Sequence, residues 1–192
     1  MKNISEVRER IIAAAEKHFS ILGFEKTTLD DITGEDGKSK TSIYYHFKNK
    51  HEIFKSVIEK EFEDIRKRLE KIVSDRRQER IENLRAYLRI RLSAMQEQGA
   101  YRHFASSRFA FGDNPVSRTV SEARKSFDKW EEAYLGDSAR RGLENGDLPD
   151  KISPEVFAST VGNILKSLEI QYFSAKDKTE IINTYEGLIE LL

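Results

Sequence analysis

The stretch from Thr27 to Lys50, TTLDDITGEDGKSKTSIYYHFKNK, decides the fold of this chain. It contains two short helical patterns on either side of Gly37. Thr28 can cap the first helix, and Asp31 stands three residues later, where its side chain can bond back to the cap. Gly37 supplies the positive φ angle that a tight turn between helices needs. Two helices joined in this way predict a helix-turn-helix, a motif whose second helix enters the DNA major groove.

The second helix of this motif is predicted over residues 40–46, with Ser39 as its cap. A third helix begins directly afterwards. Asn49 can cap it, and Glu52 takes the reciprocal position three residues later. The two caps predict that the motif leads into a new helix with almost no connecting loop.

This new helix is unusually long. Its apolar positions continue in a nearly heptad pattern as far as Val73, which is further than DNA binding requires. We therefore expect residues 50–73 to connect two domains: a helix-turn-helix DNA-binding domain over residues 1–50 and a larger helical domain over residues 51–192. The charged run 74–80 is expected to be a solvated break between helices rather than a second DNA site.

The stretch also resembles the N-terminal domain of the tetracycline-repressor (TetR) family. The residues that carry this resemblance are Thr27, Thr28, Leu29, Ile32, Gly37, Ser39, Lys40, Ile43, Tyr44, Tyr45, His46, Phe47 and Lys50. They fall within about a quarter of the chain, and SIYYHFKNK after a glycine turn is rarely seen outside that family. Three positions, Thr33, Asp36 and Lys38, depart from the usual pattern and bear on how tight the turn is.

The helix over residues 40–46 has fewer than two turns, so few of its side chains can reach base edges. If Ile43 and Phe47 face the core, as their apolarity and their spacing of four suggest, the opposite side faces the groove. Packing within the small domain is the alternative for the two tyrosines. The predicted DNA-binding residues, for which the resemblance implies the same roles at matching positions, are Thr28, Lys40, Thr41, Ser42, Tyr44, Tyr45, His46 and Lys50. Among them, Thr28 and Lys50 are predicted to bind phosphate beside free backbone N–H groups.

Charge and composition narrow the class of protein. The chain of 192 residues balances 33 basic against 33 acidic side chains, which excludes a uniformly basic coat. Residues 38–50 nevertheless carry four lysines and no acid, a local excess that suits a phosphate footprint. There is no cysteine, the first ten residues are polar, and no apolar run approaches the length of a membrane helix. We expect a cytoplasmic, all-α protein.

A first helix is expected from about Ser5 to Leu22, with an apolar stripe of Val7, Ile11, Ile12, Ala15, Phe19 and Leu22, and Gly23 is expected to end it. The rest of the chain predicts five further helices, which makes about nine in all. They are expected over residues 78–99, within 100–111, from Pro115 to Gly146 with an interruption at Gly136, from Ser153 onward, and over residues 177–192. Ser153 can cap the eighth helix, and Asp177 with Glu180 can cap the ninth.

The last two helices have apolar faces that are wide for helices packed on one side only. The resemblance implies that they pair with the same helices of a second copy in a four-helix interface. Burial within one subunit is the alternative. The predicted dimer-interface residues are Phe157, Ala158, Val161, Gly162, Leu165, Ile181, Tyr185 and Leu188. Ala158 and Gly162, four residues apart, would let another backbone approach closely.

Aromatic residues are concentrated between Tyr101 and Tyr134, where seven occur. Such a cluster is typical of a packed core, and it also suits an apolar cavity for a small effector, which the resemblance implies. The predicted effector-binding residues are Phe104, Arg108, Phe109, Phe127 and Trp130. The further candidates for polar anchors are Arg89, Arg91, Gln96 and His103.

Nothing in the sequence indicates an enzyme. There is no glycine-rich phosphate loop and no nucleophile motif, and the histidines at positions 46 and 51 have no third ligand for a metal. No cofactor is predicted. We expect a homodimeric transcriptional repressor that a small apolar molecule releases from a palindromic operator. The alternative is an architectural or partner-gated DNA-binding protein without a small-molecule ligand.

Overall fold

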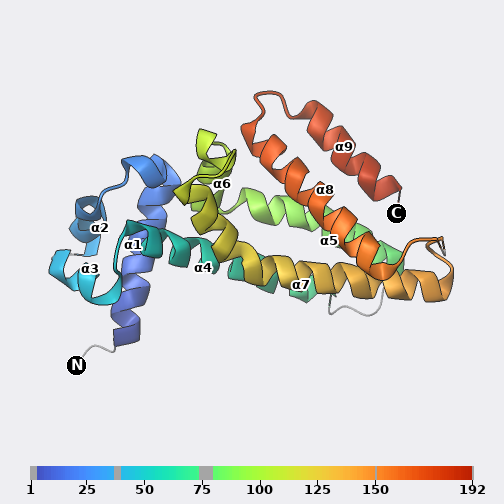
Figure 1. Ribbon diagram of the computed structural model, residues 1–192, viewed down its shortest axis with the longest axis horizontal. Coiled ribbons are helices and arrows are strands. Elements are labelled where there is room, and N and C mark those ends of the chain that lie inside the picture. Colours follow the sequence, from blue (N-terminus) through green and yellow to red (C-terminus); the bar gives the residue numbers. More distant parts are fainter. Residues whose placement is uncertain (1–3, 37–39, 74–79, 150, 192) are drawn as a thin grey trace. The chain divides into compact units, whose positions relative to one another are not determined.

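A computed structural model describes residues 4–36, 40–73, 80–149 and 151–191 of the chain (Figure 1). At the edges of its gaps, Lys40 among them, it describes the backbone alone. All regular elements in these residues are helical. In chain order they are α1 (Ile4–Lys26), α2 (Leu29–Asp36), α3 (Lys40–His46), α4 (Lys50–Val73), α5 (Arg80–Gln96), α6 (Gly99–Ala105), the 3-10 turn η1 (Arg108–Ala110), α7 (Pro115–Asn145), α8 (Pro154–Ser174) and α9 (Thr179–Glu190). The predicted all-α fold with about nine helices is confirmed.

Packing divides the chain into two compact units. The N-terminal unit comprises residues 1–62 and 96–124, and the C-terminal unit comprises residues 63–95 and 125–192. The long helices α4 and α7 each contribute residues to both units. The predicted division into residues 1–50 and 51–192 concerns function rather than packing, and it stays a prediction.

In the N-terminal unit, α1, α2 and α3 gather around the first turns of α4 (Figure 1). The apolar side chains that the sequence assigns to this core are buried. They are Ile11, Ile12, Ala15, Phe19, Ile32, Ile43, Phe47, Ile53, Phe54, Val57 and Ile58. Phe19 meets Phe54 edge to face, with ring centroids 5.0 Å apart, so α1 and α4 are joined through aromatic packing. Two predicted members of this core are not buried: Val7 is half-buried, and Leu22 is 37% exposed.

Gly23 breaks the regular helix but does not end the helical segment. Its φ of 76° and ψ of 171° are non-helical, and one further turn continues to Lys26. The positive φ requires a glycine here, and space requires one too, because a Cβ atom would lie 2.3 Å from Nε2 of His103 on α6. Thr27 then closes the turn, since its N–H and its hydroxyl both donate to the carbonyl of Gly23.

In the C-terminal unit, α7 runs without interruption from Pro115 to Asn145. The break predicted at Gly136 is therefore wrong. A Cβ atom at Gly136 would lie 3.8 Å from the Cβ of Ala158 on α8, which is an ordinary van der Waals contact, so the packing there does not require a glycine. The end of α7 is as predicted: Gly146 has a φ of 77° and follows the last helical residue.

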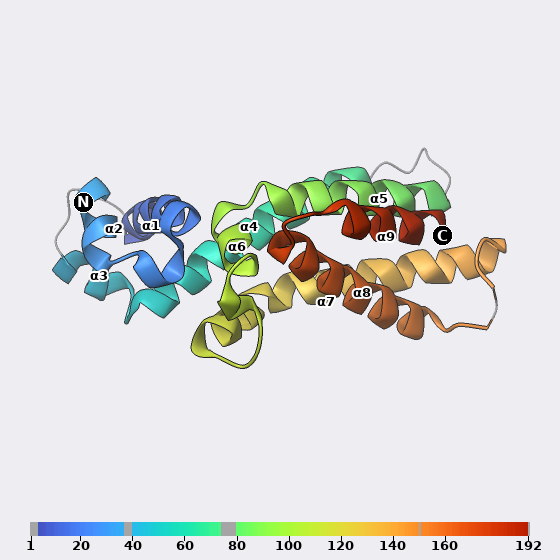
Figure 2. The ribbon, with the colours of Figure 1, turned by 90° about the horizontal axis from the view of Figure 1, so that it is seen from above.

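Helices α8 and α9 form an antiparallel pair beside α7 and α5 (Figure 2). The Ser153 hydroxyl accepts a hydrogen bond from the N–H of Val156 at 3.3 Å, and Pro154 occupies the first position of α8, both as predicted. The start of α9 differs slightly from the prediction. Asp177 accepts from the N–H of Thr179 at 2.9 Å, and the helix begins at Thr179.

Among the residues that the structure describes, none of the helices is both long enough and apolar enough to cross a membrane.

Candidate nucleic-acid interface

The start of α2 is held by the reciprocal cap that the sequence predicts. The Thr28 hydroxyl accepts from the N–H of Asp31 at 3.2 Å, and the Asp31 carboxylate accepts from the N–H of Thr28 at 2.7 Å. The Thr28 hydroxyl also donates to this carboxylate at 2.8 Å. These bonds, the one from the Thr28 backbone first, lower the pKa of Asp31. The hydrogen bonds hold the Thr28 side chain in place, and because this residue is exposed, it is also accessible.

Helix α3 has two distinct sides. Ile43 and Phe47 are each only 2% exposed and anchor the helix in the core. On the other side, Tyr44 is 56% exposed, Tyr45 is 73% exposed, and Thr41 is exposed as well. Burying the two tyrosines would have been the ordinary outcome of packing, since removing a large aromatic ring from water is favourable. The two rings instead lie exposed on the surface of a helix whose apolar side is packed in the core.

The other predicted DNA-binding residues on α3 are less exposed than the tyrosines or lie partly outside the described residues. Ser42 and His46 are half-buried, and the His46 ring meets Tyr45 edge to face at 5.1 Å. The side chain of Lys40 lies outside the described residues, as do Gly37, Lys38 and Ser39 with the predicted turn and cap.

The connection from α3 to α4 is fixed by a second reciprocal cap. Asn49 Oδ1 accepts from the N–H of Glu52 at 3.0 Å, as predicted. The Glu52 carboxylate reaches one residue further back than a capping box requires and accepts from the N–H of Lys48 at 2.7 Å. The three residues after α3 are thus tied to the first turn of α4, and α3 and α4 have little freedom to move apart.

Lys50 lies differently from what its predicted role would suggest. Its ammonium group donates to the carbonyls of Phe24 at 2.7 Å, Thr27 at 3.0 Å and Glu25 at 3.4 Å. It also lies 4.3 Å from the centre of the Phe24 ring. Desolvation by burial lowers the pKa of Lys50, against a smaller opposing effect of Glu25. The predicted phosphate contact is untested, but in this structure the group is occupied within the chain.

Arg8 on α1 belongs to this site, although no sequence motif selects it. Its guanidinium lies 4.9 Å from the centre of the Phe47 ring and donates to the Ser56 hydroxyl at 2.7 Å. It thereby joins α1, the end of α3 and α4. A lone arginine in a charged helix has no sequence signal, because its partners lie 39 and 48 positions away.

The predicted effector residues do not fall in one compact unit. Phe104, Arg108 and Phe109 belong to the N-terminal unit, where the guanidinium of Arg108 stacks over Phe109 at 4.9 Å. Phe127 and Trp130 belong to the C-terminal unit, with ring centroids 5.7 Å apart. In that unit Trp130 also stacks on Tyr134 at 6.1 Å with only 10° between the ring planes.

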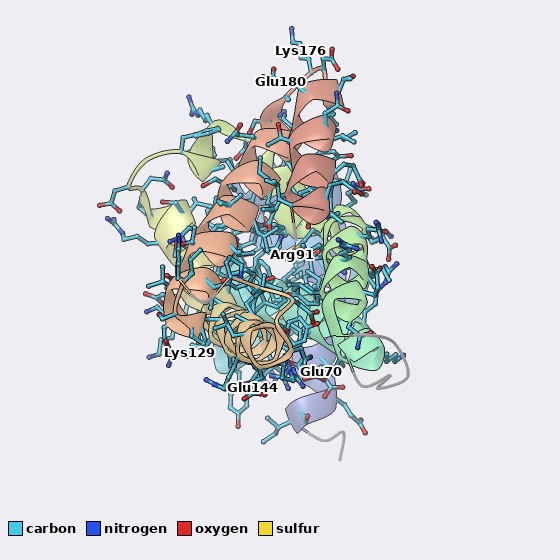
Figure 3. The ribbon with its side chains drawn as sticks, turned by 90° about the vertical axis from the view of Figure 1, so that its right-hand side faces the viewer. Glu70, Arg91, Lys129, Glu144, Lys176 and Glu180 are labelled. Carbon is cyan, nitrogen blue, oxygen red and sulfur yellow. The ribbon has the colours of Figure 1, made fainter. Side chains whose placement is uncertain are left out.

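One of the candidate anchors, Arg91, is already bound to partners within the chain. It is fully buried among the helices of the C-terminal unit (Figure 3). Its Nε and Nη2 atoms donate to the two carboxylate oxygens of Glu131, and Nη1 lies 3.0 Å from Oε2 of Glu169 in an ion pair. Glu131 accepts a further bond, at 2.6 Å, from the hydroxyl of Tyr87. These two carboxylates raise the pKa of Arg91 despite its burial.

A surface groove of about 380 Å³ lies between α7 and the start of α8. Its lining is mainly charged and includes Lys129, Glu132, Asp137, Arg140 and Glu155. It contains none of the predicted effector residues, so it differs from the apolar cavity that the aromatic cluster predicts.

The predicted dimer residues are largely packed within their own chain. Ala158, Val161, Leu165 and Tyr185 are buried, and the other four are half-buried. A Cβ atom on Gly162 would lie 3.9 Å from Cδ1 of Leu135, so the close approach that these small residues predict is made by α7 of the same chain. The apolar side chains that α8 and α9 leave exposed are Val156, Ile164 and Ile182.

The described residues contain no group of three histidine, aspartate or glutamate side chains that could hold a metal ion.

Comparison with known proteins agrees with this geometry. Residues 11–57 match the family model described as bacterial regulatory proteins of the tetR family. The negative regulator of the icaADBC biofilm operon in Staphylococcus epidermidis is 42% identical over 53 residues, which is 28% of this chain and 29% of that protein. The repressor DhaR of a Mycobacterium species is 23% identical over 83% of this chain and 81% of its own. The chain thus spans less than a third of the first of these relatives.

The fold similarity extends over the whole chain. A TetR-family regulator from Pectobacterium atrosepticum superposes with a TM-score of 0.75 at 21% identity and covers 98% of this chain and 92% of its own. NemR of E. coli, in its reduced form, gives 0.74 at 17% identity, with 97% and 96% covered.

The fold and the exposed side of α3 define a helix-turn-helix protein with a large helical C-terminal part. Residues 11–57 are thus similar to the tetR family of bacterial regulatory proteins, and the whole chain shares the fold of solved TetR-family regulators.

Proposed function

We propose that the protein is a transcriptional repressor that binds a palindromic DNA operator as a homodimer. The observation that carries this proposal is the pair of exposed tyrosines, Tyr44 and Tyr45, on a helix whose other side is buried. Together with Thr41 they present hydroxyl groups and ring edges of a size and polarity suited to base edges and phosphates. A dimer would place its two recognition helices roughly 34–36 Å apart, one turn of duplex. Such a regulator works in the cytoplasm, where the operator is.

The direct test compares variants on one operator fragment. Tyr44→Ala is expected to cost roughly 1–3 kcal/mol on the cognate site and to relax the preference at particular base pairs. Ile21→Ala, which alters an exposed apolar residue of α1, serves as the control and should leave the preference unchanged. Equal loss on cognate and random DNA for Tyr44→Ala would contradict base recognition by this face.

We further propose that a small molecule bound to the larger helical part releases the operator. The continuous helix α4, which begins four residues after the end of α3 and supplies residues to both compact units, supports this proposal. The effector needs only to prefer the conformation that does not bind DNA, by a few kcal/mol. The aromatic residues around Trp130 in the C-terminal unit are the proposed location of its apolar contacts.

The second candidate function is a regulator gated by a partner protein. The filled interior around Arg91, where an anchor for a ligand was predicted, favours it. A thermal-shift screen separates the two. A ligand present at 100 times its dissociation constant should stabilise the fold by about 2.7 kcal/mol. If no compound from a broad library shifts the melting temperature, the partner-gated function is the better account.

A further inference from the structure

The five residues from Gly23 to Thr27 form a joint between α1 and α2, and α4 holds this joint through Lys50. After the break at Gly23, the carbonyls of the last turn of α1 point away from any continuing helix. Phe24 packs beneath the joint, against Phe54 at 5.0 Å and Phe19 at 6.0 Å.

All three N–H groups of the Lys50 ammonium have a carbonyl acceptor in this joint. A lysine ammonium has three donors and no acceptor, and its nitrogen lies 2.7, 3.0 and 3.4 Å from the carbonyl oxygens of Phe24, Thr27 and Glu25. The aromatic face of Phe24 adds a cation–π contact at 4.3 Å. A DNA phosphate could bind this group only by displacing at least one of these acceptors.

Because of where the joint lies, these bonds affect the placement of the helices that would bind DNA. Helix α2 begins at Leu29, two residues after the joint, and α3 ends four residues before Lys50. Lys50 therefore fixes the start of α2 relative to α4, the helix that follows α3. The adjacent His51 strengthens this arrangement, because its ring packs on Phe24 at 4.6 Å and its Nδ1 lies 3.1 Å from the hydroxyl of Thr119.

We propose that Lys50 is a positioning residue for DNA recognition: its ammonium holds the joint between α1 and α2 on the first turn of α4 and so sets the placement of α2 and α3. The inference rests on the proposed DNA-binding function. It differs from the role that the family resemblance implies for this position, which is a direct phosphate contact. The desolvation that lowers the pKa of Lys50 agrees with an ammonium committed to the interior.

The test is the salt dependence of operator binding by Lys50→Met, which keeps the apolar stem and loses the donors. The matched control is Lys48→Met, which removes the same charge from an exposed side chain two residues away. Binding is measured on one selected duplex over a range of salt concentrations, at a temperature where circular dichroism shows each variant fully folded. The proposal predicts that Lys50→Met weakens binding by roughly tenfold more than Lys48→Met at every salt concentration. Its salt slope should fall no more than that of Lys48→Met.

Two results would overturn the proposal. A slope that falls by about 0.9 more than in the control identifies a phosphate contact. If the two variants bind with equal affinity, Lys50 does not position the recognition helices. Its bonds then contribute at most to the stability of the fold, which unfolding measurements would detect and binding measurements would not. If the wild-type protein binds no selected duplex, the proposed DNA-binding function fails as well. If it binds tightly and the Lys50 variant gives one of these two results, only the inference about Lys50 fails.

A second measurement applies if Lys50→Met does not fold. In wild-type protein, the carbonyl ¹³C resonances of Phe24 and Thr27 report the bonds to the ammonium directly. The proposal predicts that both resonances keep their chemical shifts when operator is added. Large shifts of these two carbonyls on saturation with operator would mean that the ammonium leaves the joint for the DNA.

Discussion

Arg91 is the residue on which the interior of the C-terminal unit depends most. A single guanidinium faces two buried carboxylates, Glu131 and Glu169, which come from two other helices. Removing one member of a buried charge network leaves its partners desolvated and unpaired, which costs far more than the pair contributes. Glu131 and Glu169 lie 40 and 78 residues after Arg91 in the chain, so their pairing with it is not visible in the sequence. The sequence therefore suggested that Arg91 binds a ligand, whereas in the fold it balances these two buried carboxylates.

Arg91→Met is therefore expected to destabilise the protein by roughly 3–5 kcal/mol, because two buried carboxylates lose their cation. Urea unfolding monitored by circular dichroism measures the change. Arg89→Met, an exposed arginine on the same helix, should stay within about 0.5 kcal/mol of wild type. Equal effects of the two variants would contradict the structural role given to Arg91.

Glu61 on α4 is a second buried charge, and its consequence is a dependence of stability on pH. Its carboxylate accepts from the N–H groups of Ala100 and Tyr101, both at 2.8 Å, at the start of α6. Burial raises its pKa from 4.5 to about 7, although these two bonds oppose the shift. Because the folded state binds the proton more tightly than the unfolded state, the stabilisation is complete below pH 4.5 and is lost as pH rises through 7.

Glu61→Gln removes this titration. Between pH 5 and pH 8 the stability of the variant relative to wild type should rise by roughly 3 kcal/mol, the energy that corresponds to the shift in pKa. Denaturant unfolding of both proteins at four pH values gives the difference, in which all other titrating groups cancel. A difference that does not change with pH would mean that Glu61 titrates normally in the folded protein.

At the scale of elements, the sequence predicts helix starts well because a cap is a local event. Thr28 with Asp31, Asn49 with Glu52, and Ser153 all accept the backbone N–H that their spacing indicates. The glycines were harder to interpret. Gly136 lies inside an unbroken helix, and an added Cβ atom would make only an ordinary van der Waals contact with Ala158 on α8, so this glycine marks neither a turn nor a tight approach.

Removal of one cap tests how much these helix starts contribute. Asn49→Ala should lower the free energy of unfolding by about 1 kcal/mol, because the N–H of Glu52 loses its acceptor. Asn49→Asp keeps an acceptor oxygen at the same position and should retain most of the stability. Chemical denaturation of both variants measures the effect, and an Asp variant as unstable as the Ala variant would show that the cap does not stabilise α4.

At the scale of the whole molecule, the sequence predicted the class of fold and the side of α3 that faces outward, because both depend on apolar periodicity. It could not predict which surface of α8 and α9 remains free. Ala158 and Gly162 have the small size of interface residues, yet they face α7 of the same chain. Nor could it predict that Phe104 and Trp130 belong to different compact units, since that depends on distant packing.

The proposed homodimer is best tested at the exposed apolar residues of the last two helices. Ile164→Asp, at a side chain 38% exposed, should convert the dimer to monomer in sedimentation and weaken operator binding, because only paired half-sites bind tightly. Gly162→Glu is less informative, since it would also disturb the contact with Leu135. Ile21→Asp, at an exposed apolar residue of α1, is the control and should remain dimeric. An Ile164→Asp protein that stays dimeric would place the interface elsewhere.

The central claim is that two copies of α3 read the two halves of a palindrome. Selection of bound duplexes from a random pool tests it most directly, since one experiment returns the bound sequence, its symmetry and the spacing of its halves. The account predicts enrichment of an inverted repeat whose half-site centres are separated by about one helical turn or a multiple of it. Enrichment of a single unpaired half-site, or of no sequence at all, would contradict it.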